Sequence, residues 1–254
     1  MKPLALQLYT VRDIMQNDVV GTVKRVGEIG YAGVECSGLP GMSLEDAAAL
    51  FREIGLRVSS IHSGLPDESN ADEIAAQCRI LGCSDTVVGF GPDQMATLDL
   101  TKQCAADFQR AAEVMQPRGI RVSFHNHWWE FSQTFEGRTA YEIMLAEAPD
   151  VCSELDVYWC QYGGADPVAV IEKHKARIPL LHVKDGPLTG GDHPAPHTAV
   201  GKGTLDIPAI IGATDPAVCD WLIVELDHCL DDMLTASAES YEYLIGKGLA
   251  RGRE

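Results

Sequence analysis

Short apolar runs alternate along this chain with longer segments in which apolar residues recur every three or four positions. Most of the runs contain β-branched residues, and a short, continuously apolar run is typical of a strand that is buried on both faces. The runs that we interpret as strands are Leu4–Tyr9, Gly33–Cys36, Arg57–His62, Thr86–Gly89, Arg121–Asn126, Cys152–Asp156, Ile178–Val183 and Leu222–Glu225.

The segments between these runs have the periodicity and the end signals of helices. Four of them end just before a glycine that precedes the next strand, which is the position where a helix-to-strand turn favours a positive φ. The predicted helices are Val19–Glu28, Leu44–Ile54, Asp72–Leu81, Leu98–Met115, Ala140–Glu147, Val168–Lys175 and Ser237–Gly246. Eight strands in alternation with helices favour a (β/α)₈ TIM barrel over an open doubly wound sheet.

The chain shows no linker rich in Pro, Gly and Ser that would divide it. We therefore expect one barrel over residues 1–246 and a solvated tail over residues 247–254. One connection, Asp185–Thr204, is long and rich in Gly and Pro, as functional lids often are. At its end, Gly201–Asp206 fits either a flexible clamp on a ligand or a turn into a short helix that begins near Asp206.

Charge and composition restrict the class of partner. With 20 basic and 37 acidic residues the formal net charge is −17, which disfavours nucleic acid as a partner and an endonuclease role with it. No apolar stretch is long enough to span a membrane, and the first residues lack the pattern of a secretory signal. The eight cysteines form no CxxC pair, so free thiols and a cytoplasmic location are expected.

Metal-binding side chains follow several of the predicted strands. Glu130, Asp156, His182 and Glu225 come after the fifth to eighth strands, with Glu154 on the same face as Asp156 as a possible substitute or neighbour. Carboxylates and imidazoles are the ligands that many divalent cations prefer. Because the carboxyl ends of barrel strands meet at one mouth, we expect these four residues to bind one ion there.

Other polar and aromatic residues follow the same strand ends. His125 and His127 are candidates for substrate binding, metal ligation or proton transfer, and Lys184 for electrostatic stabilisation of a substrate oxygen. Glu35 and His62 are candidate ligands for sugar hydroxyl groups. A further group could form the apolar wall for a sugar ring, among which we single out Tyr158 and Trp159.

The order and spacing of these residues resemble the xylose-isomerase-like TIM-barrel superfamily, which includes sugar phosphate isomerases and epimerases, inosose dehydratases and endonuclease-IV-like enzymes. The resemblance covers essentially the whole chain. Its clearest motifs are Phe124-His-Asn-His127 with Glu130-Phe131, Glu154-Leu-Asp156, His182-Val-Lys-Asp185, Gly201-Lys-Gly203 and Val224-Glu225.

The resemblance implies a single divalent ion such as Mn²⁺, Mg²⁺, Co²⁺ or Zn²⁺, held by Asp156, His182 and Glu225. The family's fourth ligand is a glutamate on the fifth strand, where this chain has His125-Asn126-His127, so Glu130 is expected to replace it. Barrels of this kind often pair, and the sequence leaves homo-oligomer formation open.

We therefore expect an isomerase or epimerase that acts on a sugar or sugar phosphate through a metal-bound enediolate, with Glu225, Glu130 or His127 as the base and Lys184 as the stabilising cation. A dehydratase or lyase acting on a keto-inositol or 3-keto-sugar is the alternative, because elimination shares the first proton transfer. A non-catalytic sugar-binding barrel is the third hypothesis.

Overall fold

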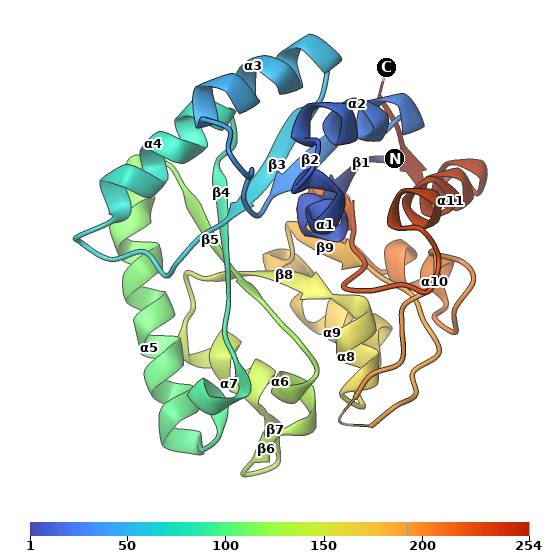
Figure 1. Ribbon diagram of the computed structural model, residues 1–254. Coiled ribbons are helices and arrows are strands. Elements are labelled where there is room, and N and C mark those ends of the chain that lie inside the picture. Colours follow the sequence, from blue (N-terminus) through green and yellow to red (C-terminus); the bar gives the residue numbers. More distant parts are fainter. Residues whose placement is uncertain (192, 254) are drawn as a thin grey trace.

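The computed structural model describes residues 1–191 and 193–253, and its eight main strands close into a parallel barrel (Figure 1). The sheet order is β1-β2-β3-β4-β5-β8-β9-β10, and β10 pairs with β1, Leu4 lying opposite Leu222, to complete the ring. This closure confirms the predicted (β/α)₈ barrel and excludes the open sheet. The barrel strands are β1 (Lys2–Gln7), β2 (Gly33–Cys36), β3 (Arg57–His62), β4 (Asp85–Gly89), β5 (Arg121–His125), β8 (Cys152–Asp156), β9 (Leu180–Val183) and β10 (Trp221–Val224).

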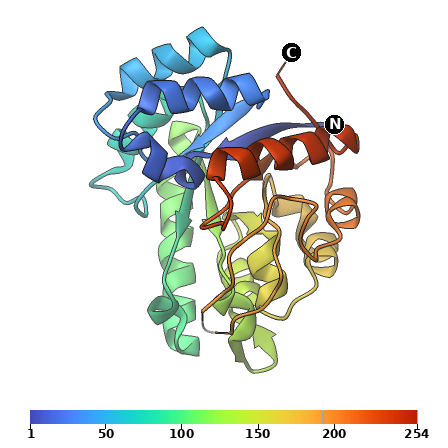
Figure 2. The same cartoon turned by 45° about the vertical axis from the view of Figure 1, so that its right-hand side comes forward.

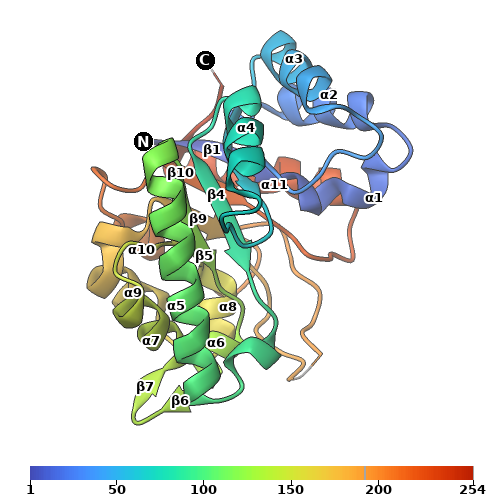
Figure 3. The same cartoon turned by 90° about the vertical axis from the view of Figure 1, so that its left-hand side faces the viewer.

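Helices surround the barrel, and α5 lies along one side of it (Figures 1 and 3). Four helical segments end at glycines with positive φ, namely Gly30, Gly55, Gly82 and Gly119, as the sequence predicted. The α-helices are α1 (Arg12–Met15), α2 (Val19–Ile29), α3 (Leu44–Ile54), α4 (Ala71–Leu81), α5 (Leu98–Met115), α6 (Trp129–Ser132), α7 (Ala140–Glu147), α8 (Val157–Tyr162), α9 (Pro167–His174), α10 (Ile207–Gly212) and α11 (Met233–Gly246). Short 3₁₀ helices lie at Leu8–Val11, Pro92–Met95, Gln116–Arg118 and Lys175–Arg177.

The structure corrects the expected C-terminal tail. Ala250–Arg251 form strand β11, which pairs in parallel with Lys2 and Pro3 of β1, and Ala250 is buried. The chain therefore forms a strand beside the first residues of β1, where residues 247–254 were expected to be a solvated tail. Glu254 lies outside the described residues. The two termini lie near each other in Figures 1 and 2.

Several short elements were not predicted, among them α1, α6, α8 and a hairpin. Helix α8 begins directly after β8, with no intervening loop, because the Asp156 side chain caps it by accepting a hydrogen bond from the Trp159 backbone N–H. A small antiparallel hairpin of β6 (Thr134–Phe135) and β7 (Arg138–Thr139) follows α6. Helix α10 confirms the turn into a short helix near Asp206, which caps it.

A thin apolar layer inside the barrel supports the polar mouth. Ala5, Leu180 and Ile223 form part of a small buried cluster that is separate from the larger core. Side chains two positions apart on a strand share a face. The residues two positions further along these strands, Gln7, His182 and Glu225, therefore also point inward, at the carboxyl end. Among the described residues, no helix has both the length and the apolar character needed to cross a bilayer.

Candidate active site

The carboxyl ends of the strands bring the predicted polar residues together in the interior. Within the group, Glu35, Glu154, Asp156 and His182 are fully buried, while His125 and Glu225 are each 5% exposed. Buried charged groups are stable only when they are paired or bind a cation. The cluster is therefore held together by its own ion pairs, in two overlapping groups that have the composition of metal sites.

One group, which we call the ion group, consists of His125, Asp156, His182 and Glu225. One ligand atom from each of these residues lies within 4.8 Å of the others. His182 Nδ1 lies 2.9 Å from a Glu225 oxygen but makes no hydrogen bond, and Asp156 Oδ2 lies 2.9 Å from the Lys184 ammonium group, again without a hydrogen bond. Two ligands of an octahedral ion at about 2.1 Å are roughly 3 Å apart. Two buried atoms without hydrogen bonds and a donor set of nitrogen and oxygen fit a divalent cation.

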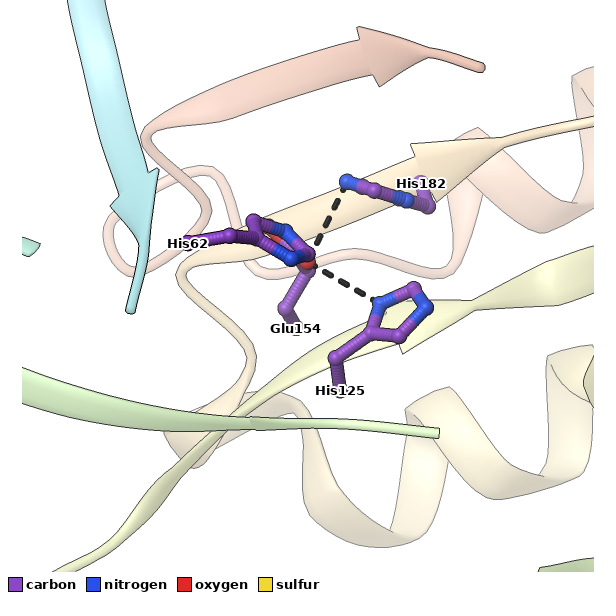
Figure 4. Close-up of side chains that lie close together, drawn as sticks. All are labelled: His62, His125, Glu154 and His182. Atoms are coloured by element: carbon purple, nitrogen blue, oxygen red, sulfur yellow. Dashed lines mark hydrogen bonds and ion pairs between the residues drawn. The ribbon is translucent and has the colours of Figure 1, made fainter. Parts of the chain in front are cut away.

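The second group surrounds Glu154 (Figure 4). One Glu154 oxygen lies 3.0 Å from His125 Nδ1, 3.1 Å from His182 Nε2 and 3.2 Å from His62 Nε2. Burial raises the pKa of Glu154, but His182 and the other two imidazoles outweigh burial and lower the pKa well below its usual value. Glu154 is therefore a carboxylate that orients three imidazole rings at once.

Glu35 lies behind His182. One of its oxygens accepts a hydrogen bond from Gln7 at 2.6 Å and lies 2.7 Å from His182 Nε2, and its other oxygen accepts one from the Ser60 hydroxyl. A proton on Nε2 leaves the Nδ1 lone pair directed at the ion group. When a carboxylate fixes the tautomer of a histidine in this way, the histidine binds a metal ion more tightly. The substrate-binding role expected for Glu35 stays a prediction.

Lys184 is buried among three carboxylates. Its ammonium group lies 2.9 Å from one oxygen each of Asp156, Glu225 and Asp227. Burial lowers the pKa of Lys184, but the three carboxylates outweigh burial and raise it well above its usual value. The same contact lowers the pKa of Glu225 well below its usual range, against the effect of burial. Lys184 therefore shares two carboxylates with the ion group.

The segment after β5 places its histidines differently. His125 joins both groups, while His127 is 28% exposed in its side chain and stacks on Trp129 with ring centroids 4.2 Å apart. Glu130 accepts a hydrogen bond from the His127 backbone N–H, and burial raises the pKa of the Glu130 carboxyl group. Glu130 lies outside both groups, so its role as a ligand stays a prediction that the geometry does not support.

Aromatic rings pack beside Lys184. Trp159 lies 5.5 Å from its ammonium group, and Tyr158 and Trp159 both contact the His197 ring. Tyr158 is fully buried. The sugar-binding role expected for these two rings stays a prediction.

The long connection after β9 is anchored by Asp185. Its carboxylate is buried and accepts four backbone hydrogen bonds, from Gly186 and Leu205 on one oxygen and from Gly201 and Gly203 on the other. The backbone N–H groups of Gly201 and Gly203 therefore already donate hydrogen bonds to a side chain of the protein itself. Asp192 of this connection lies outside the described residues.

Several members of the site were not among the predicted site residues. They are Gln7, Ser60, Asp227 and His197, and each contacts a predicted residue. The Asp227 carboxylate accepts a hydrogen bond from Lys184, and its backbone N–H donates one to His197 Nδ1 in the long connection. Asp227 is two residues beyond Glu225, so its position after the eighth strand was a usable signal. Gln7 and Ser60 required knowledge of which strands are neighbours.

Comparison with protein families shows to which family this barrel belongs. The family described as xylose isomerase-like TIM barrel matches residues 23–245. This chain belongs to that family. The match confirms the resemblance that the motifs indicated. No curated protein matches the chain in sequence.

Solved structures share the whole fold. A sugar phosphate isomerase/epimerase from Parabacteroides distasonis has 24% sequence identity and a TM-score of 0.81 over 98% of this chain and 96% of its own. A structure titled as IOLI protein with a bound zinc atom has 16% identity and a TM-score of 0.71, covering 97% of this chain and 99% of its own. A probable 3-DHS dehydratase, AsbF, from Bacillus anthracis has 14% identity and a TM-score of 0.72, over 96% and 99%. At these identities the likeness concerns the fold.

Proposed function

We propose that this protein is a divalent-metal-dependent sugar isomerase or epimerase, and that His125, Asp156, His182 and Glu225 hold the ion. The observation that carries the proposal is the convergence of these four buried ligand atoms within 4.8 Å at the carboxyl end of the barrel. In our proposal His125 takes the fourth position, for which the sequence suggested Glu130. In TIM-barrel enzymes this end of the barrel is where catalytic residues gather. The zinc in the IOLI structure belongs to a relative of the same fold.

A divalent ion bound there would supply Lewis-acid stabilisation for the negative charge that develops on the substrate's oxygens. Glu225 would remove the proton from the carbon next to the substrate carbonyl, because its carboxylate lies at the mouth of the barrel beside both His182 and Lys184. Lys184 would donate a hydrogen bond to the substrate oxygen that gains charge. Its ammonium group has three N–H donors and three carboxylate neighbours, so the substrate oxygen would take the place of one of these carboxylates.

Proton return to the opposite face of the substrate needs a second group near the mouth. His127 suits this role because it is partly exposed, its ring lies beside His125 with centroids 5.1 Å apart, and the Glu130 carboxylate lies 3.9 Å from its Nδ1. Return of the proton to the other carbon gives an isomer, and return to the opposite face gives an epimer. Because Lys184 is already paired with three carboxylates, this group favours a neutral sugar at least as much as a phosphate ester.

A lyase is the second candidate, favoured by the imidazoles at the mouth. His62 and His127 flank His125 and have side chains that are 25% and 28% exposed. Either ring could protonate a leaving hydroxyl group, which would turn the same first proton transfer into an elimination from a 3-keto-sugar or keto-inositol.

Exchange with solvent deuterium tests the proposal. The metal-loaded protein should incorporate deuterium next to the carbonyl group of a ketose in D₂O and form the isomer or epimer, as followed by NMR. Asp156→Asn should abolish the exchange although asparagine can still cap α8. Asp166→Asn is the matched control, because Asp166 caps α9 outside the site. Elimination products without isomer would favour the lyase, and sugar binding without exchange would favour the non-catalytic barrel.

A further inference from the structure

A second concave site lies at the opposite end of the barrel from the ion group. It is a pocket of about 1010 Å³, and we call it the floor pocket. Its lining includes the first residues of several barrel strands, among them Arg57 of β3, Arg121 of β5 and Trp221 of β10. It is therefore open at the amino ends of the strands, on the side where the chain termini lie in Figures 1 and 3.

The floor pocket concentrates positive charge in an acidic protein. Six basic residues and only two acidic residues, Asp85 and Asp220, line it, whereas the whole chain has a net charge of −17. Arg121 forms ion pairs with both of these aspartates. The basic residues are Lys2, Arg52, Arg57, Arg79, Arg121 and Arg251.

Several of these cations have no acidic partner. In the described part of the chain, Lys2, Arg52, Arg57 and Arg79 form no ion pair with any carboxylate. The Arg57 guanidinium instead lies over the Trp221 ring, 4.5 Å from its centroid. Like charges placed close together repel each other, and a bound anion would relieve that repulsion. Guanidinium groups match phosphate and carboxylate oxygens in pairs of hydrogen bonds.

We propose that the floor pocket binds a compact polyanion that carries phosphate groups. A concave pocket encloses a small ligand, whereas a long nucleic acid would be repelled by the acidic surface beyond the pocket. The proposal does not depend on the ion group, since the two sites lie at opposite ends of the barrel and share no residue.

Calorimetric titration of the metal-free, full-length protein with inorganic pyrophosphate tests this. EDTA should be present, so that no phosphate is bound through a metal ion, and ionic strength should be constant because exposed charge interactions are screened by salt. The double variant Arg52→Gln/Arg79→Gln should weaken binding about 10- to 100-fold, as expected for the loss of charge-assisted hydrogen bonds. Lys24→Gln/Arg25→Gln removes the same charge from the exposed side of α2 and should leave binding unchanged.

Three outcomes would overturn the proposal. The first is that pyrophosphate binds no more tightly than sulfate at equal ionic strength. The second is that the two double variants weaken pyrophosphate binding equally. The third is that citrate binds more tightly than pyrophosphate. The last result would identify a carboxylate site. A thermal unfolding curve of each variant without ligand shows whether that variant is folded. If the double variant is not folded, Arg57→Lys provides a second test, because it retains the charge.

Discussion

The two ring nitrogens of His182 face different carboxylates, and this division is central to the proposed metal site. Nε2 lies 2.7 Å from Glu35, and Nδ1 lies 2.9 Å from Glu225 without a hydrogen bond. If Glu35 keeps the proton on Nε2, then Nδ1 is available as a ligand. Glu35 would thus act as a positioning residue rather than as a contact to substrate.

Glu35→Gln should therefore weaken metal binding. We expect a loss of about 10- to 100-fold in affinity for Mn²⁺ or Zn²⁺, the usual effect of losing an outer-shell carboxylate. Competition with a chelator, without any substrate, measures this directly. Glu53→Gln, on the exposed side of α3, is the control. An unchanged metal affinity together with a raised KM would instead support the substrate-binding role predicted from the sequence.

His197 makes the stability of the mouth depend on pH. Burial and the nearby charge of Lys184 lower the pKa of His197 to about 4, and its Nδ1 accepts the Asp227 backbone N–H. In the unfolded chain the same group titrates near pH 6.5. The unfolded state therefore binds more protons between these values, so the free energy of unfolding contributed by this residue is lost as the pH falls from about 6.5 towards 4.

Asparagine at position 197 keeps an acceptor but cannot titrate. Denaturant unfolding of wild type and His197→Asn between pH 7 and pH 4 should show the wild type losing about 3 kcal/mol more than the variant, at 1.4 kcal/mol per pK unit. If the free energy of unfolding of the two proteins depended on pH in the same way, the pKa of His197 would be the same in the folded and the unfolded state.

At this scale the sequence identified most of the residue types but not their pairing. Alternation along β8 indicated that Glu154 and Asp156 share a face. Glu154 nevertheless lies among imidazoles, whereas Asp156 lies beside Lys184. This difference depends on the register of β8 against β5 and β9. Register between parallel strands is set by packing across the whole barrel, which no local pattern reports.

Among the elements, the glycine-containing connection between β9 and α10 depends on close contact with Asp185. A Cβ atom built at Gly203 would lie 2.0 Å from an Asp185 oxygen and 2.3 Å from the Gly186 backbone nitrogen. Any side chain there must displace the carboxylate that binds four backbone amides. A buried amide that loses its acceptor costs about 1–3 kcal/mol.

Gly203→Ala should therefore lower the free energy of unfolding by several kcal/mol, on the order of 3. Gly212→Ala is the matched control, because a Cβ at this last residue of α10 meets no atom within 4 Å. That change should leave stability unchanged or raise it by up to about 1 kcal/mol. Equal effects of the two substitutions in chemical denaturation would show that Asp185 does not anchor the connection.

Elements with both a periodic pattern and an end signal were predictable from the sequence. Helices α3, α5 and α7 have the predicted bounds, and Gly55 ends α3 as expected. Helix α8 was missed because the residue that ends the strand also caps the helix, so no turn residues separate the two. Strand β11 was missed because its two residues pair only with β1, a contact distant in sequence.

Over the whole molecule, the two ends of the barrel differ in chemistry. The carboxyl end holds buried carboxylates and imidazoles suited to a divalent cation, while the floor pocket is lined mainly by basic side chains. The closed sheet keeps the two ends apart and gives each a fixed geometry. The negative charge of the chain as a whole favours the approach of cations.

The identity of the ligands around the ion is the central claim. A crystal of the Mn²⁺-soaked protein, with anomalous diffraction recorded at the manganese edge, locates the ion independently of any assumption about the site. We predict a single strong peak about 2.0–2.3 Å from His182 Nδ1 and from Asp156, Glu225 and His125. A peak coordinated by His62 and Glu154, by Glu130, or at the floor of the barrel would contradict it.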